Sequence, residues 1–226
     1  MTALRLAPYA APMKITADAL LFDNDGTLVS SMESVVRCWT RWAEEYGVTE
    51  EFARVELHGR PAADIIGDLL PADRVAEARR RIDELEVEDV PGGVRLLPGT
   101  LDLLAGLPQE RWAVVTSAGR ALAEARLAEA GIRPGLLITA DDITRGKPDP
   151  EPFLLAAGKL GADPARCVVF EDAPAGLAAA RAAGMRTVAL TTTTSREELD
   201  ADIVVADLSA VSARAVDGGV EIIAGE

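Results

Sequence analysis

The sequence has few cysteines and no long apolar segment, and both absences narrow the class of protein. Its two cysteines, Cys38 and Cys167, lie far apart among apolar residues. We therefore expect buried free thiols in a reducing cytoplasm and no disulfide framework. No segment approaches the roughly 18 uninterrupted apolar residues that a membrane helix requires. Residues 1–12 also lack the long apolar block of a signal peptide, so we expect a cytoplasmic protein.

Positive charge is scarce as well. The 226 residues include 23 lysines and arginines against 37 aspartates and glutamates, which gives a net charge of −14. Because broad phosphate-binding surfaces need basic residues, this balance argues against nucleic acid and membranes as partners. It does not exclude a small phosphate-containing substrate, which a local cluster of cations can hold. We expect such a substrate as the partner of a monomer or a weak homodimer.

The chain contains an alternation of short apolar segments with segments rich in Ala, Leu, Glu and Arg. Its hydrophobic fraction of 49% and charged fraction of 27% are ordinary for a globular protein. The alternation predicts an α/β fold with a Rossmann-like parallel sheet and helices on its faces. The expected strands are 19–23, 112–116, 136–139, 167–170, 186–190 and 202–205. Three of the expected helices are 120–130, 152–160 and 175–183. Near the C-terminus, Asp217-Gly218-Gly219 suggests a short hairpin.

One block, from about residue 31 to residue 96, has only helical patterns. Val35, Trp39, Trp42 and Tyr46 recur at helical spacing, so we expect one apolar face that packs a small helical domain. A substrate-lining role for either tryptophan is the alternative. The predicted organisation is an α/β core of residues 14–30 and 97–226, an inserted all-helical cap domain of residues 31–96, and a flexible N-terminal extension of residues 1–13.

Two acids, Asp23 and Asp25, end the first apolar run, and Gly26 marks the point where that strand stops. Side chains two positions apart share one face of an extended chain, so the two carboxyl groups converge. They would lie at the C-terminal edge of the sheet, where open α/β sheets bind ligands. Two acids this close repel each other unless a cation or a proton lies between them. The pattern favours metal-assisted covalent catalysis over structural packing.

Polar residues also occur near the ends of later strands. Thr116 and Ser117 precede a helix and offer groups that bind an anion, although helix capping explains this pair alone more simply. Lys147, one of only three lysines, can neutralise a carboxylate and a phosphate oxygen together; a solvated loop lysine is the alternative. Glu171 and Asp172 form a second acid pair of the kind that Mg²⁺ needs, whereas a helix cap is the competing interpretation of Asp172.

In this order the four groups resemble the four motifs of the haloacid dehalogenase-like hydrolase superfamily, over about residues 19–205. The helical insertion directly after the first motif is similar to the subgroup with an all-helical cap. Within that subgroup, the stretches 112–119, 138–153 and 168–176 are similar to sugar phosphatases and glycerol phosphate phosphatases. The resemblance implies a Mg²⁺-dependent phosphatase that hydrolyses a small sugar or polyol phosphate through an aspartyl-phosphate.

The resemblance also implies a role for each motif residue. Asp23 is the expected nucleophile and Asp25 the general acid and base, which a dehalogenase does not need because halide leaves without a proton. The expected Mg²⁺ ligands are Asp23, the backbone carbonyl of Asp25, and Asp172, with Glu171 binding directly or indirectly. Lys147 is expected to act in catalysis. The expected phosphate-binding residues are Thr27, Thr116, Ser117, Ala118 and Lys147.

Substrate choice is expected to lie in the cap. His58 and Arg60 occupy a turn between helical stretches and are candidates to hydrogen-bond a sugar hydroxyl; an exposed turn without substrate contact is equally open. Ser30 stands where this subgroup often has an acid, which bears on cap closure or substrate choice. Two other functions also stay open: a sugar phosphomutase on the same scaffold, and a non-catalytic module that binds phosphorylated metabolites.

Overall fold

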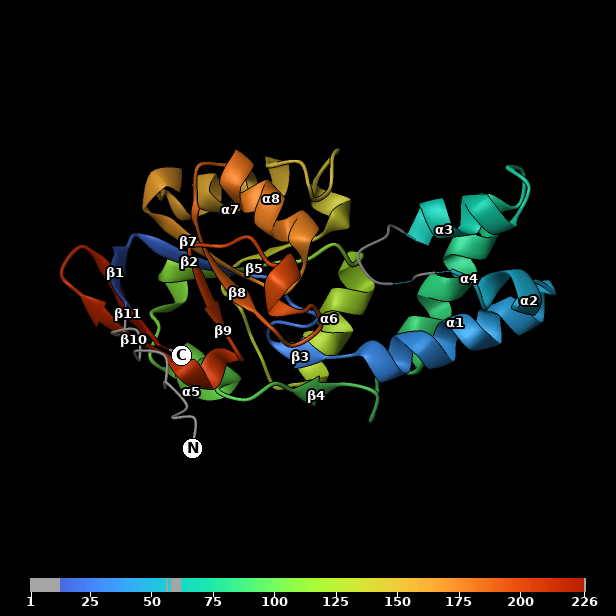
Figure 1. Cartoon of the computed structure of the whole chain (residues 1–226), viewed down its shortest axis with the longest axis horizontal. Helices are drawn as coiled ribbons and strands as arrows, with labels where there is room; N and C mark the ends of the chain where they lie inside the picture. The colour runs from blue at the N-terminus through green and yellow to red at the C-terminus, as the bar shows by residue number, and fades with distance from the viewer. Residues whose placement is uncertain (1–12, 56, 58–61, 226) are drawn as a thin grey trace, which may run out of the picture.

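The centre of the molecule is a six-stranded parallel sheet (Figure 1). The computed structural model describes residues 13–55, 57 and 62–225. From one edge of the sheet to the other the strands are β6 (Leu137–Ile138), β5 (Trp112–Val115), β2 (Ala19–Phe22), β7 (Cys167–Glu171), β8 (Arg186–Leu190) and β9 (Ile203–Val205). These are the six predicted strands, with ends that differ by at most one or two residues, so the predicted α/β fold is confirmed.

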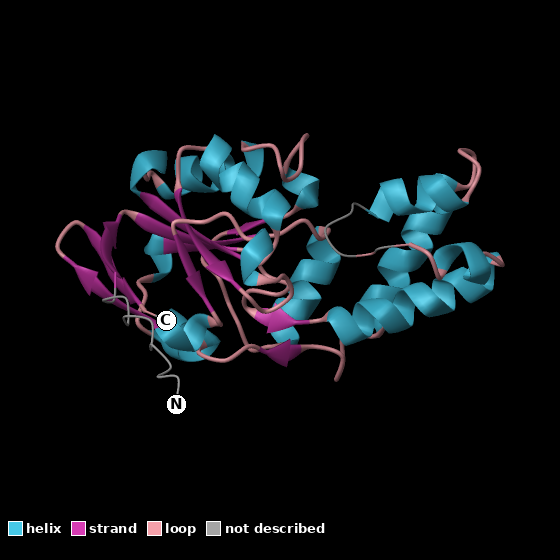
Figure 2. Cartoon of the chain, viewed as in Figure 1, coloured by secondary structure: helices cyan, strands magenta, loops and turns pink. Residues whose placement is uncertain are grey.

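Both faces of the sheet are covered by helices, as Figure 2 shows. Leu20 and Phe22 of β2 pack with α5 (Thr100–Ala105) and α6 (Arg120–Glu129), whereas Ala19 and Leu21 point to the opposite face. The helices on that opposite face are α7 (Glu151–Leu160) and α8 (Pro174–Ala182). All four side chains of β2 are buried, which explains why this strand is an unbroken apolar run without alternation. The burial fixes β2 in the middle of the fold.

A second, antiparallel sheet closes one end of the molecule. It consists of β1 (Met13–Ala17), β11 (Gly219–Ala224) and β10 (Val211–Val216), in that spatial order. The hairpin between β10 and β11 turns at residues 217 and 218, so the predicted hairpin is confirmed. Strand β1 was not predicted, and Met13 belongs to it, pairing with Ala224. The assignment of Met13 to the N-terminal extension was therefore wrong, while residues 1–12 lie outside the described residues.

Four helices, α1 (Met32–Tyr46), α2 (Thr49–Phe52), α3 (Ala62–Leu69) and α4 (Val75–Glu88), form a separate group beside the sheet (Figure 1). We call them the helical insertion. They share an apolar core of their own, in which Trp42 is fully buried and its indole Nε1 donates to the carbonyl oxygen of Ala78 at 2.9 Å. Trp39 stacks on Phe52 at 5.9 Å between ring centroids. The predicted apolar face therefore packs this group of helices.

The chain passes twice between the sheet and the helical insertion, and the two crossings pair with each other. Strand β3 (Val29–Ser30) leads out and β4 (Arg95–Leu96) leads back, and they form an antiparallel ribbon. The expectation of no strand between residues 31 and 96 was therefore wrong at β4. Two-residue strands are too short to leave a periodic signal in a sequence. The ribbon ties both crossings into one structural element.

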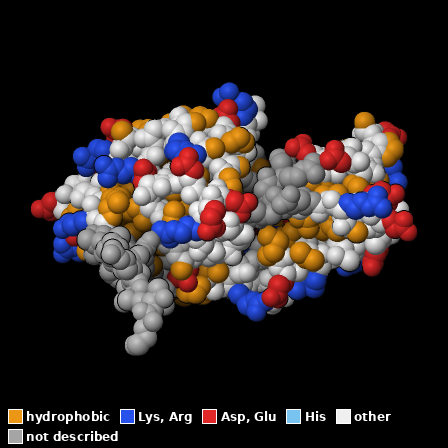
Figure 3. Space-filling model, in the orientation of Figure 1, with side chains coloured by type: hydrophobic (Ala, Val, Ile, Leu, Met, Phe, Trp, Pro, Cys, Tyr) orange, Lys and Arg blue, Asp and Glu red, His pale blue; other side chains and the backbone are white. Residues whose placement is uncertain are grey.

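Both cysteines lie in the interior, and the surface carries charges of both signs. Cys38 and Cys167 are free and buried, as predicted, and burial raises the pKa of each thiol to about 11. Acidic and basic side chains are interspersed on the face drawn in Figure 3. Within the described part of the chain, no helix combines the length and the apolarity needed to cross a bilayer.

Candidate active site

The candidate site lies where three neighbouring strands end. Asp23 directly follows β2, Thr116 follows β5, and Glu171 is the last residue of β7. In the sheet β2 lies between β5 and β7, and all three run parallel. Their carboxyl ends therefore meet at one edge, and the connections from β2 and β7 open a crevice there. This topology brings together residues that are more than 90 positions apart in the sequence.

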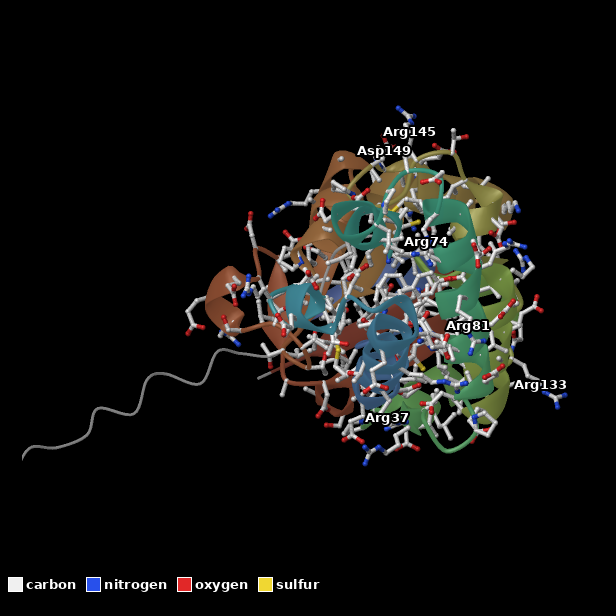
Figure 4. The ribbon with its side chains drawn as sticks, turned by 90° about the vertical axis from the view of Figure 1, so that its right-hand side faces the viewer. Arg37, Arg74, Arg81, Arg133, Arg145 and Asp149 are labelled. Carbon is white, nitrogen blue, oxygen red and sulfur yellow. The ribbon has the colours of Figure 1, made fainter. Side chains whose placement is uncertain are left out.

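Lys147 connects all three of these strand ends. Its Nζ donates to Asp23 Oδ1 at 2.7 Å, to the carbonyl oxygen of Val115 at 2.9 Å and to Glu171 Oε1 at 2.5 Å. Its side chain is only 7% exposed, which rules out the alternative of a solvated loop lysine. Arg145 and Asp149, from the same loop, instead pair at 3.3 Å at the surface (Figure 4). The loop thus turns one cation into the site and another outward.

Three buried acids share this single ammonium. One oxygen from each of Asp23, Glu171 and Asp172 lies within 4.8 Å of the others. Glu171 uses both oxygens within the protein, because Oε1 accepts from Lys147 and Oε2 accepts from the backbone N–H groups of Asp172 and Ala173. Asp172 Oδ2 accepts a hydrogen bond from the Thr193 hydroxyl. The N-cap of α8 is Ala173, without a side-chain cap, so Asp172 does not serve as the helix cap.

Burial shifts the pKa of every group in this cluster. It raises the pKa of Asp172 to about 7, with a further contribution from the nearby Asp23 charge. It likewise raises the pKa of Asp23, against the opposing effect of Lys147, and the pKa of Glu171. Burial alone would lower the pKa of Lys147, but the charges of Asp23 and Glu171 raise it. With three acids around one cation, the protein alone leaves negative charge uncompensated.

Two glycines leave room for this cluster. A Cβ at Gly26 would lie 2.0 Å from Asp172 Oδ2, and Gly26 also has a φ of +91°. A Cβ at Gly176, in the first turn of α8, would lie 1.8 Å from Glu171 Oε1. Such distances are far inside van der Waals contact, so any side chain at either position would displace a carboxylate. The backbone at these two glycines therefore leaves just enough space for the carboxylates of Asp172 and Glu171.

The carboxylate of Asp25 is held apart from this cluster. Ser31 Oγ donates to Asp25 Oδ1 at 2.6 Å, and Arg126 Nη1 lies 3.0 Å from Asp25 Oδ2. Asn24 Nδ2 adds a longer hydrogen bond of 3.3 Å to Oδ2. Asp23 and Asp25 thus lie at the same edge of the sheet, as predicted, but their carboxyl groups do not share a partner. Their carboxyl groups have different partners, which allows them different chemistry.

The predicted phosphate-binding residues do not all reach the site. Thr116 and Ser117 both line the cavity. Ser117 is exposed, whereas Thr116 is buried and its hydroxyl oxygen accepts from the N–H of Ala118 at 3.1 Å. Neither Thr116 nor Ser117 caps α6, whose N-cap is Gly119. Thr27 is fully buried and is not among the residues that line the cavity. Its side chain therefore does not reach the cavity, and its contact with phosphate stays a prediction.

A cavity of about 590 Å³ covers the strand ends. One wall is the sheet edge, with Asp23, Asp25, Lys147 and Asp172, and the opposite wall is the helical insertion. The insertion contributes Trp39 to this wall, so Trp39 lines the cavity in addition to its packing role, as the alternative prediction allowed. Trp42 does not line the cavity. His58 and Arg60, predicted to contact substrate, lie outside the described residues. Ser30 lines the cavity next to the crossing.

Two groups of cavity residues were not predicted from the sequence. Arg126 of α6 and Glu86 of α4 line the cavity side by side as an ion pair at 3.8 Å, and Arg126 is 4% exposed. Burial raises the pKa of Glu86 to about 7. The second group, Thr192 and Thr193, follows β8, and the hydroxyl of Thr192 donates to the carbonyl oxygen of Gly26. The run of four threonines at residues 191–194 after an apolar strand was an available signal for this second group.

The chain was compared with known proteins. A family model described as haloacid dehalogenase-like hydrolase matches residues 17–184. Hexitol phosphatase A of Escherichia coli (strain K12) is 39% identical over 180 residues, which cover 75% of this chain and 81% of that protein. Validoxylamine A 7'-phosphate phosphatase of Streptomyces hygroscopicus subsp. limoneus is 41% identical over 206 residues, covering 84% and 94%. The crystal structure of CbbY from Rhodobacter sphaeroides in complex with phosphate has a TM-score of 0.72 at 26% identity, covering 85% and 95%.

Proposed function

The chain belongs to the haloacid dehalogenase-like hydrolase family, and from this premise we propose that it is a magnesium-dependent phosphatase of a small sugar or polyol phosphate. Its curated relatives are phosphatases, so the chain is a phosphoric monoester hydrolase. The observation that carries the proposal is the convergence of Asp23, Lys147 and Asp172 at the ends of the central strands.

In the proposed reaction Asp23 is the nucleophile. A carboxylate oxygen of Asp23 attacks phosphorus, the bond from phosphorus to the ester oxygen breaks, and an aspartyl-phosphate forms on Asp23. Lys147 contacts Asp23 at 2.7 Å and stays protonated, so it can hold the carboxylate in place and offset the charge of the phosphate. Ser117 and the backbone near Ala118 are proposed to donate hydrogen bonds to the phosphate oxygens, because both line the cavity beside Asp23.

Asp25 is the proposed general acid and base. It donates its proton to the departing ester oxygen, and it later takes a proton from the water that attacks the aspartyl-phosphate. An alkoxide leaves poorly without a proton, and general acid or base catalysis typically contributes about 10²–10⁴-fold. Ser31 and Arg126 hold the Asp25 carboxyl group on the cavity wall. These contacts support a side chain that is oriented toward the leaving group and kept away from the acidic cluster.

The residues present fit a Mg²⁺ ion. Hard divalent cations prefer carboxylate oxygens, and the three buried acids carry more negative charge than Lys147 can offset. Asp23 and Asp172, with the backbone carbonyl of Asp25, would hold the ion. Both oxygens of Glu171 already have partners, so we propose that Glu171 positions Lys147 and the Asp172 backbone instead of binding metal. When bound, Mg²⁺ would supply electrostatic stabilisation of the phosphoryl group.

The helical insertion is proposed to act as a cap, with domain limits of 31–96 for the cap and 14–30 with 97–226 for the core. It forms the wall opposite the sheet edge, so a substrate in the cavity would be largely shielded from water. The volume of about 590 Å³ is large enough for a small ligand. Relatives named for hexitol and glycerol phosphates support a polyol or sugar phosphate as substrate.

A phosphate-release assay tests the proposal. The purified protein with MgCl₂ is incubated with phosphate esters of glycerol, hexitols, hexoses, 2-deoxyglucose and glycolate, and with nucleotide monophosphates. We expect rapid release of inorganic phosphate from at least one polyol or sugar ester. Formation of an isomeric sugar phosphate without free phosphate would show a mutase instead. Tight binding of an ester with no turnover would show a non-catalytic binding module.

Replacement of Gly26 is predicted to remove activity through the Asp172 carboxylate. Gly26→Ala places a Cβ where Asp172 Oδ2 now lies, 2.0 Å away, so we expect kcat/KM to fall at least about tenfold as the acid moves. Gly47→Ala is the matched control, because Gly47 also has a positive φ of 69° but has nothing within 4 Å of its Cβ position. Both variants should lose about 1–2 kcal/mol of stability from backbone strain. Equal activity in the two variants would contradict the prediction.

A further inference from the structure

Arg126 is a buried cation whose donors are only partly used. It lies on α6, its side chain is 5% exposed, and its Nη1 contacts Asp25 Oδ2 at 3.0 Å. Among the described residues, its Nε and Nη2 have no hydrogen-bond acceptor. Buried guanidinium donors normally have acceptors, because an unpaired one loses its hydration without replacement. Since Arg126 lines the cavity, a ligand in the cavity can supply the missing acceptor.

Glu86 lies close to the Nη2 donor of Arg126. It lies on α4 of the helical insertion, its side chain is 13% exposed, and its Oε1 is 3.8 Å from Arg126 Nη2. This separation is too long for a direct hydrogen bond. Both side chains line the same cavity. A donor from the sheet side and an acceptor from the insertion thus form an ion pair at 3.8 Å without a direct hydrogen bond between them.

We infer that Arg126 and Glu86 form a subsite for a hydroxyl group of the substrate. A hydroxyl donates one hydrogen bond and accepts others, so it can donate to Glu86 and accept from Arg126 Nη2 at the same time. This inference rests on the proposed function, and it narrows the substrate to hydroxylated phosphate esters. An alkyl group in this place would leave both buried partners unsatisfied.

The charges around the subsite favour a neutral group over a second anion. The cavity wall there has two cations, Arg79 and Arg126, and three acids, Asp25, Asp83 and Glu86. A second phosphate or a carboxylate has no proton to donate to Glu86, and an ionised Glu86 would repel it at short range. A hydroxyl carries no charge and uses the donor and the acceptor alike. The subsite therefore distinguishes polyol monophosphates from bisphosphates and phosphorylated acids.

The position of the hydroxyl in the substrate follows from the two contacts of Arg126. The planar guanidinium of Arg126 contacts Asp25 through Nη1 and presents Nη2 to the subsite. Because Asp25 is the proposed proton donor to the ester oxygen, the hydroxyl that accepts from Nη2 lies close to that oxygen. A hydroxyl on the carbon next to the ester carbon meets this requirement. The inferred substrate class is thus the phosphate monoesters of 1,2-diols, such as polyols.

Two esters that differ only in hydroxyl groups test this inference. Glycerol 1-phosphate carries the adjacent hydroxyl, and n-propyl phosphate lacks it. We expect the wild-type protein to prefer glycerol 1-phosphate in kcat/KM. Glu86→Leu should lower kcat/KM for glycerol 1-phosphate about 10–100-fold, as expected for the loss of a hydrogen bond to a charged group. It should lower kcat/KM for n-propyl phosphate by a clearly smaller factor, because that ester loses only the indirect support of Glu86 to Arg126 and not a hydrogen bond of its own.

The matched control is Glu84→Leu, two positions earlier on α4. Glu84 is 63% exposed and pairs with Arg81, which lies on α4 at the surface (Figure 4), so both esters should keep their wild-type kinetics. Glu86→Met, an unbranched apolar variant, gives a second measurement if the leucine variant melts early. Equal losses on both esters, or no wild-type preference, would overturn the subsite. Absence of phosphate release from either ester by the wild-type protein would instead count against the proposed phosphatase function.

Discussion

Asp23→Asn is expected to abolish turnover, with a loss in kcat on the order of 10⁴-fold or more, as for removal of other catalytic nucleophiles. The amide has nearly the shape of the carboxylate but cannot form the acyl-phosphate bond. The measurement is phosphate release at high enzyme concentration over hours. Since burial raises the pKa of Asp23, the neutral amide also removes an unfavourable buried charge. We therefore expect the metal-free variant to melt at a temperature no lower than that of the wild type.

The control for this prediction is Asp18→Asn. Asp18 precedes β2, at the opposite end of the strand from Asp23, and its carboxylate pairs with Arg166 at 2.7 Å near the surface. This variant should retain wild-type kcat, although it loses an ion pair of small energetic value. Substantial turnover by Asp23→Asn, at more than a few per cent of wild type, would remove Asp23 from the role of nucleophile.

Removal of Mg²⁺ is expected to lower the rate of hydrolysis about a hundredfold or more, because the metal supplies several kcal/mol of charge stabilisation. The protein is treated with EDTA, desalted and assayed before and after addition of MgCl₂. Activity should return on addition of Mg²⁺, and an equal ionic strength of KCl should have no effect. Undiminished activity after complete chelation would contradict the proposed use of the acidic cluster.

The affinity for Mg²⁺ should also depend on pH. The pKa of Asp172 is raised from 3.8 to about 7 in the metal-free protein, chiefly by burial. Its protonated form therefore stabilises the fold below the unfolded value, and this contribution is lost as pH rises through about 7. Mg²⁺ needs the ionised carboxylate, so below pH 7 its affinity should fall up to about tenfold per pH unit for each proton displaced.

Thermal melting measures this linkage without any assay of activity. The rise in Tm caused by a fixed concentration of MgCl₂ should be larger at about pH 8 than at about pH 6. In Asp172→Asn, which has no proton to release at this position, the rise should be smaller and should depend less on pH. A rise in Tm that is the same at both pH values in the wild-type protein would argue against carboxylates that release protons on binding metal.

Much of the fold and of the site could be predicted from local sequence patterns. Acids directly after an apolar run mark the end of a buried strand, and this applies to both Asp23 and Glu171. Such patterns place each motif at a strand end, but they do not pair the motifs with one another. The contact between Lys147 and Asp23 spans 124 positions. The resemblance to a known family placed both residues in one site in advance, but not the contact between them.

The residues that were missed look ordinary in the sequence. Arg126 lies in a helix that also contains Arg120, and the side chain of Arg120 is 39% exposed, whereas that of Arg126 is 5% exposed. The difference arises from the packing of α4 near α6, which no local pattern encodes. Strand β1 was missed for a similar reason, because its partner β11 lies about 200 positions later. Burial by distant segments is a property of the fold as a whole.

The position of the Thr27 side chain away from the cavity has a local cause. The chain turns sharply at Gly26, where φ is +91°, and the Thr27 N–H then bonds back to the carbonyl oxygen of Asn24 at 3.3 Å. The turn carries the Thr27 side chain into the interior, away from the cavity. A sequence motif states which residue types occur together, but not the dihedral angles between them.

The paired crossings β3 and β4 have a mechanical consequence. Two separate linkers would let the helical insertion move in many directions, whereas two crossings joined by hydrogen bonds must move together and so restrict its motion. The backbone of Asp25 forms a β-bridge with Val29 of β3. A movement of the ribbon is therefore transmitted directly to the loop that carries Asp25, the proposed proton donor. A substitution in the ribbon should therefore change both the entry of substrate and the orientation of Asp25.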